Sequence, residues 1–476
     1  MKKETIKTII LVLLIANCIQ LTGQIWLDKK LWPSGYNFFS YVSNIPVIGG
    51  IAGLFTSDDE LFQSEELFDA AALPKRIVVN GGSAREVCYY GDKLYTDVFG
   101  YTKTVMESLV SEPVQYSTVS ALQWQSMLKG KSIYINFNFA VDATALGGIY
   151  SLDDVSALSH FSTARSIVIS PDTVTNGINV CVLDSKSNEI VKYFMNFRGS
   201  ELLKYIEGIT FGKQLDHAFA FEMGLDSTMD DFSVERRFVL DSMVLFPMSI
   251  SRKDAITLES AFDQNEDISF VADKIIATFG YKPSSLRRTV ATDGVVTYVE
   301  NNATVTVDPS GGVEYTAVTA SRGMPVTKSG KLTARQAAIE TINIAKNVWK
   351  FSGFPPHNEI RLHSDLSDNN SGTYTVRLVY FAGGVPVMFT ADNESDDGAS
   401  IYAEIEDGHL KHFRMELVSI KQGDGTMGWT SVLEAVDTLF SGNSGNGQSL
   451  KINDIFECYS VDGNKNVTPE WYIKFD

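Results

Sequence analysis

The side chains of this sequence that could do chemistry are few and widely spaced. Two histidine pairs are the clearest candidates: His357 and His363 in HNEIRLH, and His409 and His412 in HLKH. On a strand, His357 and His363 would share a face but stand about 20 Å apart, whereas a zinc ion needs its ligands at about 2 Å. His409 and His412 would point to opposite faces of a regular strand. The histidines therefore predict no metal site.

Three acidic clusters, SDDE, DNESDDG and STMDDF, could in principle hold a hard cation through carboxylate oxygens. None of them has the ligand spacing of an EF-hand loop. We interpret all three as solvated loops.

The motifs of common enzyme classes are also missing. The sequence has no G-x-S-x-G elbow, Walker A loop, G-x-G-x-x-G after a strand, H-E-x-x-H, or S-x-x-K with its partners. We therefore expect a protein that is not an enzyme, with no metal and no cofactor. A pair of glycosidase carboxylates is assembled in space and leaves no local mark, so that alternative stays open.

Hydrophobic periodicity predicts strands and turns over much of the chain. IYINFNFAV (133–141) alternates apolar and other residues, which is typical of a half-buried strand. INVCVLD and EIVKYFMNF flank the polar turn SKSN and predict a hairpin. The turn signals NNA and DPSGG divide 295–318 into three strands. Later hairpins are expected to turn at AGG (382–384) and EDG (406–408).

Helical patterns lie between these strands. The strongest is TARQAAIETINIAKNVWKF (333–351), which repeats apolar residues at helical spacing. Weaker patterns cover 101–112, 119–130, 268–280 and 430–440. We therefore predict an α+β fold of antiparallel sheets packed with helices.

The same patterns divide the chain into domains. We predict a cytoplasmic tail (1–7), a transmembrane helix (8–26), a juxtamembrane segment and linker (27–74), an N-terminal mixed α+β domain (75–255), a central helix-plus-hairpin domain (256–330) and a C-terminal helix-on-sheet domain (331–476).

Composition limits the partners. The 476 residues include 58 Asp and Glu but only 40 Lys and Arg, a net charge of −18. Such an acidic body repels nucleic acid, so we expect no nucleic-acid partner. Cys18 falls in the apolar N-terminal segment, and Cys88, Cys181 and Cys458 follow at wide, irregular spacing. One disulfide could form among these three, and the spacing does not say which.

The segment Thr8 to Trp26 decides where the protein resides. Thirteen of its nineteen residues are apolar and none is charged, which is about the length that crosses a bilayer. A cleaved secretory signal and a lipoprotein signal cut before Cys18 are the alternatives. The bulky, charged sequence after the segment lacks a small-residue cleavage site, and Asn17 before Cys18 is unusual for a lipoprotein. A retained helix is therefore the preferred interpretation.

The flanks of this helix predict its orientation. Cationic residues before a span and an aromatic belt after it place the N-terminus in the cytoplasm and the bulk of the chain outside, at the cell membrane. Lys29 and Lys30 on the far side weaken this bias. The cationic flank is Lys2, Lys3 and Lys7, and the belt is Trp26, Trp32, Tyr36, Phe38 and Phe39.

Polar residues within the segment form a stripe. At 100° per residue, Asn17, Gln20 and Gln24 lie within an arc of about 60°. Amides in hydrocarbon need hydrogen-bond partners, and Ala16 and Gly23 allow another helix to approach closely. We predict that these five residues form a transmembrane partner contact. The alternative is that Gln24 lies at the headgroup level and the other two amides are merely tolerated.

Several stretches together resemble the YycH family of Firmicutes. They are the N-terminal segment to Trp26, FDAAALPKRIVVNGG with YTDVFG, the block PSSLRRTVATDGVVTYVENNATVTVDPSGGVEYTAV, and the ending TPEWYIKFD. Relative to that family KLWPSGYNFFSYVSNIPVIGGIAGLF resembles an insertion, and the role of residues 31–55 stays open.

The resemblance implies a single-pass accessory of the WalK (YycG) sensor histidine kinase, working with a YycI-like protein to tune cell-wall metabolism. Its transmembrane helix would meet those of the kinase, and its C-terminal units would be YycI-like. The sign of regulation, the stoichiometry and any sensed envelope ligand stay open. The rival functions are a surface-anchored module that binds a peptide or wall fragment, and an unrecognised wall hydrolase.

Overall fold

The computed structural model describes most of the chain after residue 67. By backbone contacts the chain divides into Met1–Glu60 and Leu61–Asp476, and the described residues belong to the second unit. They are 68–112, 114–172, 174–212, 216–226, 238–250, 252–262, 267–327, 332–352, 359–363, 367–368, 372–390, 397–442 and 450–475.

Several expectations lie outside these residues. The apolar segment 8–26 and its stripe of Asn17, Gln20 and Gln24, with Ala16 and Gly23, are not described, so they stay predictions. Among the helices that are described, none has the length and apolar character needed to cross a membrane. The proposed domain boundaries also stay a prediction.

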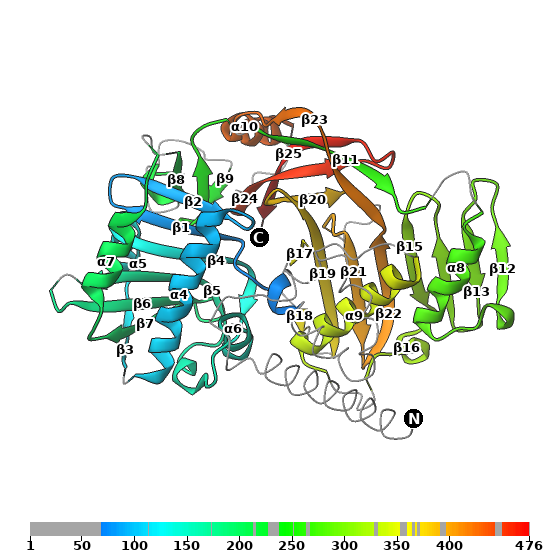
Figure 1. Ribbon diagram of the computed structural model, residues 1–476, viewed down its shortest axis with the longest axis horizontal. Coiled ribbons are helices and arrows are strands. Elements are labelled where there is room, and N and C mark those ends of the chain that lie inside the picture. The colour runs from blue at the N-terminus through cyan, green and yellow to red at the C-terminus, as the bar shows by residue number, and fades with distance from the viewer. Residues whose placement is uncertain are drawn as a thin grey trace, which may run out of the picture. The chain divides into compact units, whose positions relative to one another are not determined.

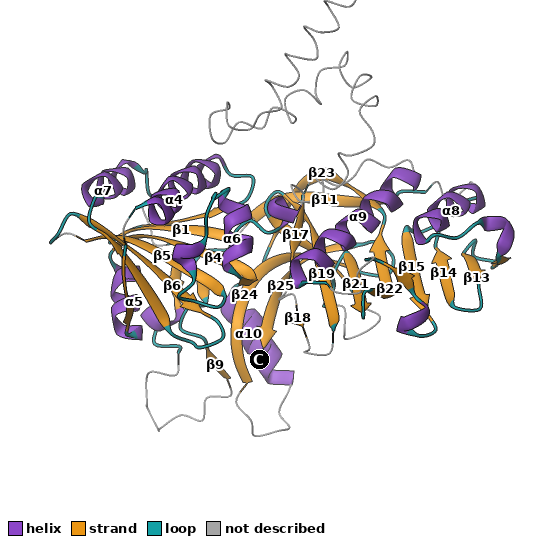
Figure 2. Cartoon of the chain, turned by 90° about the horizontal axis from the view of Figure 1, so that it is seen from below, coloured by secondary structure: helices purple, strands orange, loops and turns teal. Residues whose placement is uncertain are grey.

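The first sheet has seven antiparallel strands in the order β2-β1-β4-β5-β6-β7-β3. In Figure 2, helices α4 and α7 cover one face and α5 covers the other. The strands are β1 (Arg76–Gly81), β2 (Arg85–Tyr89), β3 (Gln115–Val119), β4 (Lys131–Val141), β5 (Ala164–Asp172), β6 (Gly177–Asp184) and β7 (Ile190–Met195), and the helices are α4 (Lys93–Ser111), α5 (Ala121–Lys129), α6 (Ala143–Tyr150) and α7 (Gly199–Gly208).

Helices on both faces of the sheet change the burial of strand β4. Residues 132–137 of β4 are buried without interruption. Ile133 and Ile135 pack in the core beneath α4 and α7, while Tyr134 packs with Trp124 of α5 in a second core. The prediction of a half-buried strand at 133–141 is therefore wrong in its burial, although the strand itself is confirmed. A strand covered on both sides loses its polar face.

A second sheet contains fourteen of the described strands, with the main order β12-β13-β14-β15-β22-β21-β19-β20-β24-β25. Figures 1 and 2 show α8 and α9 on one face of it. The strands are β9 (Phe238–Leu240), β12 (Arg287–Val290), β13 (Val296–Val299), β14 (Ala303–Val307), β15 (Gly312–Ala317), β16 (Met324–Pro325), β17 (Ile360–Leu362), β18 (Ser367–Asp368), β19 (Thr373–Ala382), β20 (Val385–Phe389), β21 (Ile401–Glu406), β22 (His409–Glu416), β24 (Leu450–Val461) and β25 (Val467–Phe475), with α8 (Ser269–Ile275) and α9 (Ala334–Ser352).

The residues of helix α9 themselves determine where the helix begins and which face is buried. Thr333 precedes it, and the Oγ1 atom of Thr333 accepts a hydrogen bond from the backbone N–H of Gln336 at 3.2 Å, while the Gln336 side chain accepts from the N–H of Thr333 at 3.0 Å. This reciprocal pair satisfies two N–H groups at the helix start. The apolar face then buries Ile342, Val348 and Trp349. The helix predicted at 333–351 is confirmed.

The smaller elements complete the described fold. The predicted hairpin is confirmed as β6–β7, and the three strands predicted in 295–318 are confirmed as β13, β14 and β15. Two more strand pairs are separate from the large sheets. They are β8 (His217–Phe219) with β10 (Leu245–Pro247) and β11 (Arg252–Ser260) with β23 (Val418–Gly428), and the last helix is α10 (Val432–Gly442).

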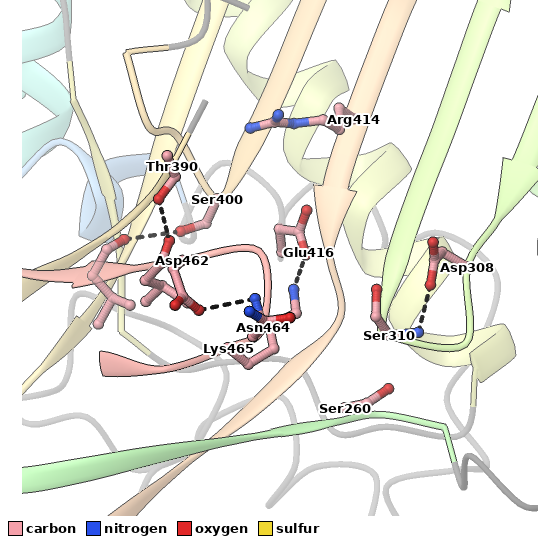
Figure 3. A network of polar contacts seen from close by, with 12 residues as sticks. Ser260, Asp308, Ser310, Thr390, Ser400, Arg414, Glu416, Asp462, Asn464 and Lys465 are labelled. Carbon is pink, nitrogen blue, oxygen red and sulfur yellow. Dashed lines mark hydrogen bonds and ion pairs between the residues drawn. The ribbon is translucent and has the colours of Figure 1, made fainter. Parts of the chain in front are cut away.

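A polar network secures the turn between β24 and β25 (Figure 3). Lys465 in this turn pairs with Glu416 of β22. The Oγ1 atom of Thr390 donates to the carbonyl of Val461 at 2.8 Å, and Asp462 accepts the backbone N–H of Asn464 at 2.8 Å. These contacts hold the last hairpin against the rest of the sheet, so that β24 presents its side chains at a defined place.

Candidate functional site

Three charged side chains meet where the first sheet lies against β24. The Nζ atom of Lys75, just before β1, is 2.6 Å from Oδ2 of Asp454. The Nη2 atom of Arg76, the first residue of β1, is 3.2 Å from Oδ1 of the same carboxylate. The side chains of Lys75 and Arg76 are 6% and 3% exposed, and that of Asp454 is 21% exposed. One carboxylate thus compensates two buried cations.

This arrangement shifts the ionisation of its members. Burial alone would raise the pKa of Asp454, but the positive charges of Lys75 and Arg76 outweigh it and hold that pKa at about 2. Burial lowers the pKa of Lys75 to about 7, because it and the charge of Arg76 outweigh the attraction of Asp454. The carboxylate is therefore ionised throughout the neutral range.

His363 lies beside this cluster and is neutral. Its side chain is buried, and its ring meets those of Tyr472 and Phe456 edge-on, with centroids 5.2 and 6.2 Å away. Burial, followed by the charges of Lys474 and Lys75, lowers its pKa to about 3. A protonated imidazole would bring a further positive charge to an already cationic place.

A cavity of about 740 Å³ opens beside the cluster. This volume falls within the usual range for sites that bind small molecules. Aromatic side chains and charged side chains share its lining. The residues that line it include Phe68, Arg76, Tyr134, Asn136, Phe137, Asn138, Phe139, Asp142, Arg165, Ser166, Lys186, Asp241, Arg335, His363, Lys451, Asn453, Asp454, Phe456 and Lys474.

Irregular pairing in three strands produces much of this lining. The register of β4 with β5 breaks between Asn136 and Val141, which frees residues 137–140 from the ladder. The register of β5 with β6 shifts at Arg165, and that of β24 with β25 shifts at Asn453. The cavity is lined by residues from all three breaks. Such bulges redirect side chains and are common beside binding sites.

A polar row crosses the floor of the cavity. Arg76, Asn136 and Ser166 are register partners on β1, β4 and β5, so their side chains lie side by side on one face. The Nδ2 atom of Asn136 donates to Oγ of Ser166 at 3.3 Å, and the hydroxyls of Tyr134 and Ser166 are 3.0 Å apart. Two atoms of this row, Nε of Arg76 and Oδ1 of Asn136, are buried without a hydrogen-bond partner in the described structure.

The carboxylates of the cavity have structural contacts. Oδ1 of Asp142 accepts the N–H of Ala145 and caps α6. Oδ1 of Asp241 accepts the N–H of Met243, and Asp454 holds the two buried cations. A glycosidase requires one carboxyl whose pKa is raised, whereas that of Asp454 is lowered. The geometry of this cavity favours binding over acid–base chemistry.

The other candidate residues from the sequence are dispersed. His357 and most of the acidic clusters lie outside the described residues. His409 and His412 do not point to opposite faces, because a bulge in β22 lets both Leu410 and Phe413 enter the core. Cys88, Cys181 and Cys458 are buried free thiols. In the part of the chain that the structure describes, no three potential ligands gather around a metal position.

Sequence reasoning missed the cavity. Its one local signal is PKRIVV, where two cations lead directly into a buried strand and so require a buried counter-charge. Asp454, which supplies that charge, is 379 positions from Lys75. The polar row spreads over three strands, so no contiguous motif marks it.

Comparison with known proteins identifies the fold. No family model matches the sequence, and no curated protein matches it at a significant level. Among solved structures, the chain is similar to the crystal structure of YycH from Bacillus subtilis, with a TM-score of 0.53 and 11% identity over 86% of this chain and 95% of that one. The fold is that of YycH.

The YycH resemblance predicted from the sequence is thereby confirmed at the level of fold. The predicted α+β class with large antiparallel sheets agrees with it. An uncharacterized protein from Eubacterium rectale is also similar, with a TM-score of 0.31 and 12% identity over 48% of this chain and 77% of that one.

Proposed function

We propose that this chain is a membrane-anchored regulator of a sensor histidine kinase of the WalK (YycG) class, and not an enzyme. The observation that supports the proposal is the YycH fold, which extends over nearly all of the YycH chain. In this proposal a single helix at 8–26 holds the protein in the cell membrane, with its N-terminus in the cytoplasm. A YycI-like protein is the second partner, and the regulated output is cell-wall metabolism.

The proposed contact is the stripe of Asn17, Gln20 and Gln24. An accessory shifts a kinase only if it binds one signalling state better than the other, and a change from 1:99 to 99:1 requires about 5.5 kcal/mol of preference. Interhelical amide hydrogen bonds contribute about 0.6 to 2 kcal/mol each. The stripe would supply part of the preference, and the folded region after residue 67 the remainder.

Co-purification from membranes tests the proposal. The full-length chain is compared with a variant that carries Asn17→Leu, Gln20→Leu and Gln24→Leu, and the partners are identified by mass spectrometry. Thr22→Leu is the matched control, because Thr22 lies on the opposite side of the helix from the stripe. We expect the wild type and the Thr22 variant to retain a histidine kinase and a small single-pass protein, and the triple variant to lose both.

The opposite results are equally informative. If the triple variant retains the kinase, the amides are not the contact. If the wild type brings down no kinase at all, the regulatory function is refuted.

A further inference from the structure

We propose that the cavity beside Asp454 binds a small acidic polyol, meaning a molecule that carries a phosphate or carboxylate together with a neighbouring hydroxyl group. The binding itself follows from the cavity. Only its role as the signal that the regulator senses rests on the proposed function.

The lining of the cavity is cationic. Its cationic side chains outnumber its carboxylates six to three, and His363 is neutral. When Asp69, which pairs with Arg335 at 3.5 Å, is also counted, the net charge is +2 in a chain whose net charge is −18. A cationic concavity in an acidic protein concentrates small anions from solution. The cations are Arg76, Arg165, Lys186, Arg335, Lys451 and Lys474, and the carboxylates are Asp142, Asp241 and Asp454.

Two buried polar atoms of the lining have no hydrogen-bond partner in the described structure. Nε of Arg76 is a donor and Oδ1 of Asn136 is an acceptor, and the two residues are register partners on β1 and β4. Arg76 is 3% exposed and Asn136 is 8% exposed. Each buried polar atom that lacks a partner destabilises the unliganded protein, because it has given up its hydrogen bonds to water. Both residues line the cavity, and a hydroxyl group is the ligand group that can accept from a donor such as Nε and donate to an acceptor such as Oδ1.

Irregular strand pairing contributes to the space of the cavity. Breaks in the pairing of β4, β5 and β24 all fall on the cavity lining. Each break gives up regular ladder hydrogen bonds, and one isolated bulge would be a local feature of its strand. Three that open the same space, with Phe137, Phe139 and Phe456 on its walls, form the mixed aromatic and polar lining of a small-molecule site.

The test is calorimetric titration of the purified full-length chain with two probes, glucose 6-phosphate and glucuronate. Uncharged glucose and inorganic phosphate are the controls. The two probes distinguish a phosphate ligand from a carboxylate ligand. We expect at least one probe to bind at millimolar concentration, glucose not to bind, and inorganic phosphate to bind at least about tenfold more weakly than the better probe.

Two variants locate the binding. Lys474→Gln removes a cation of the lining without removing either partner of the Asp454 pairs, and we expect it to weaken binding at least about fivefold. Asn136→Leu removes the unpaired acceptor together with the hydrogen bond that Asn136 donates to Ser166, and we expect it to weaken binding of the probe. Lys421→Gln is the matched control, because Lys421 is an exposed residue of β23 outside the cavity.

Four results overturn the proposal: glucose binds as well as either probe, inorganic phosphate alone binds as well as the better probe, neither probe binds, or the Lys474 variant binds like the wild type. If binding follows the expected pattern while probes leave kinase co-purification unchanged, the site stands and its regulatory role fails. If no kinase co-purifies but the probes bind, the proposed function fails and the site stands.

Discussion

Replacement of Asp454 by Asn should destabilise the protein strongly. The carboxylate lies 2.6 Å from the ammonium group of Lys75 and 3.2 Å from the guanidinium of Arg76. The amide of Asn keeps the shape and removes the charge, so two nearly inaccessible cations lose their common counter-ion. Loss of one partner from a buried pair costs about 3 to 5 kcal/mol, chiefly because a buried charge is left uncompensated.

The cost for Asp454→Asn should therefore reach about 3 kcal/mol or more. Lys75 can release its proton because burial already lowers its pKa to about 7, and without Asp454 that pKa falls further. Arg76 stays charged, so the penalty does not disappear at alkaline pH. We also expect the loss to be larger than for any single exposed ion pair of the same chain.

The matched control is Glu259→Gln on β11. Glu259 pairs with Lys421 on β23, and these side chains are 58% and 55% exposed. Exposed pairs contribute about 0 to 1 kcal/mol. Urea unfolding followed by tryptophan fluorescence gives the free energy of unfolding of both variants. If Asp454→Asn costs less than about 1 kcal/mol, or no more than Glu259→Gln, Asp454 does not compensate buried charge.

Three further predictions concern stability. Burial and nearby cations lower the pKa of His363 to about 3 and that of His217 to about 4. Because the unfolded chain binds these protons near pH 6.5, the contribution of the two neutral histidines to stability should be complete above that pH and should fall as the pH drops towards 4. His363→Gln should flatten this part of the profile measured by urea unfolding, and an unchanged profile would exclude His363 as a contributor. Thr333→Ala removes the atom that accepts the backbone N–H of Gln336 at the start of α9 and should lower the free energy of unfolding by about 1 kcal/mol. The measurement is the thermal midpoint of unfolding, and an unchanged midpoint would mean that this cap does not contribute to stability. Gly100 is exposed within α4, and there is open space where a Cβ would be added. Gly100→Ala should therefore raise the free energy of unfolding by about 0.5 to 1 kcal/mol, and a lower free energy of unfolding would contradict the open surroundings.

Local hydrophobic periodicity was enough to predict many of the helices and strands. Helix α9 and strands β13 to β15 were predictable because each depends on the spacing of its own apolar residues and on nearby caps and turns. The burial of β4 was not predictable from its own sequence, since it depends on helices that precede and follow β4 in the chain. The faces of His409 and His412 were also missed, because one bulge inverts the alternation beyond it.

The sequence by itself determined the acidic composition, the apolar segment at 8–26 with its amide stripe, the α+β class and the resemblance to YycH. Only the tertiary structure decided the candidate site. Lys75 and Asp454 are 379 positions apart, and the polar row of Arg76, Asn136 and Ser166 exists only through strand pairing. A cavity is a property of how sheets meet and where their ladders break, and neither is recorded in the spacing of neighbouring residues.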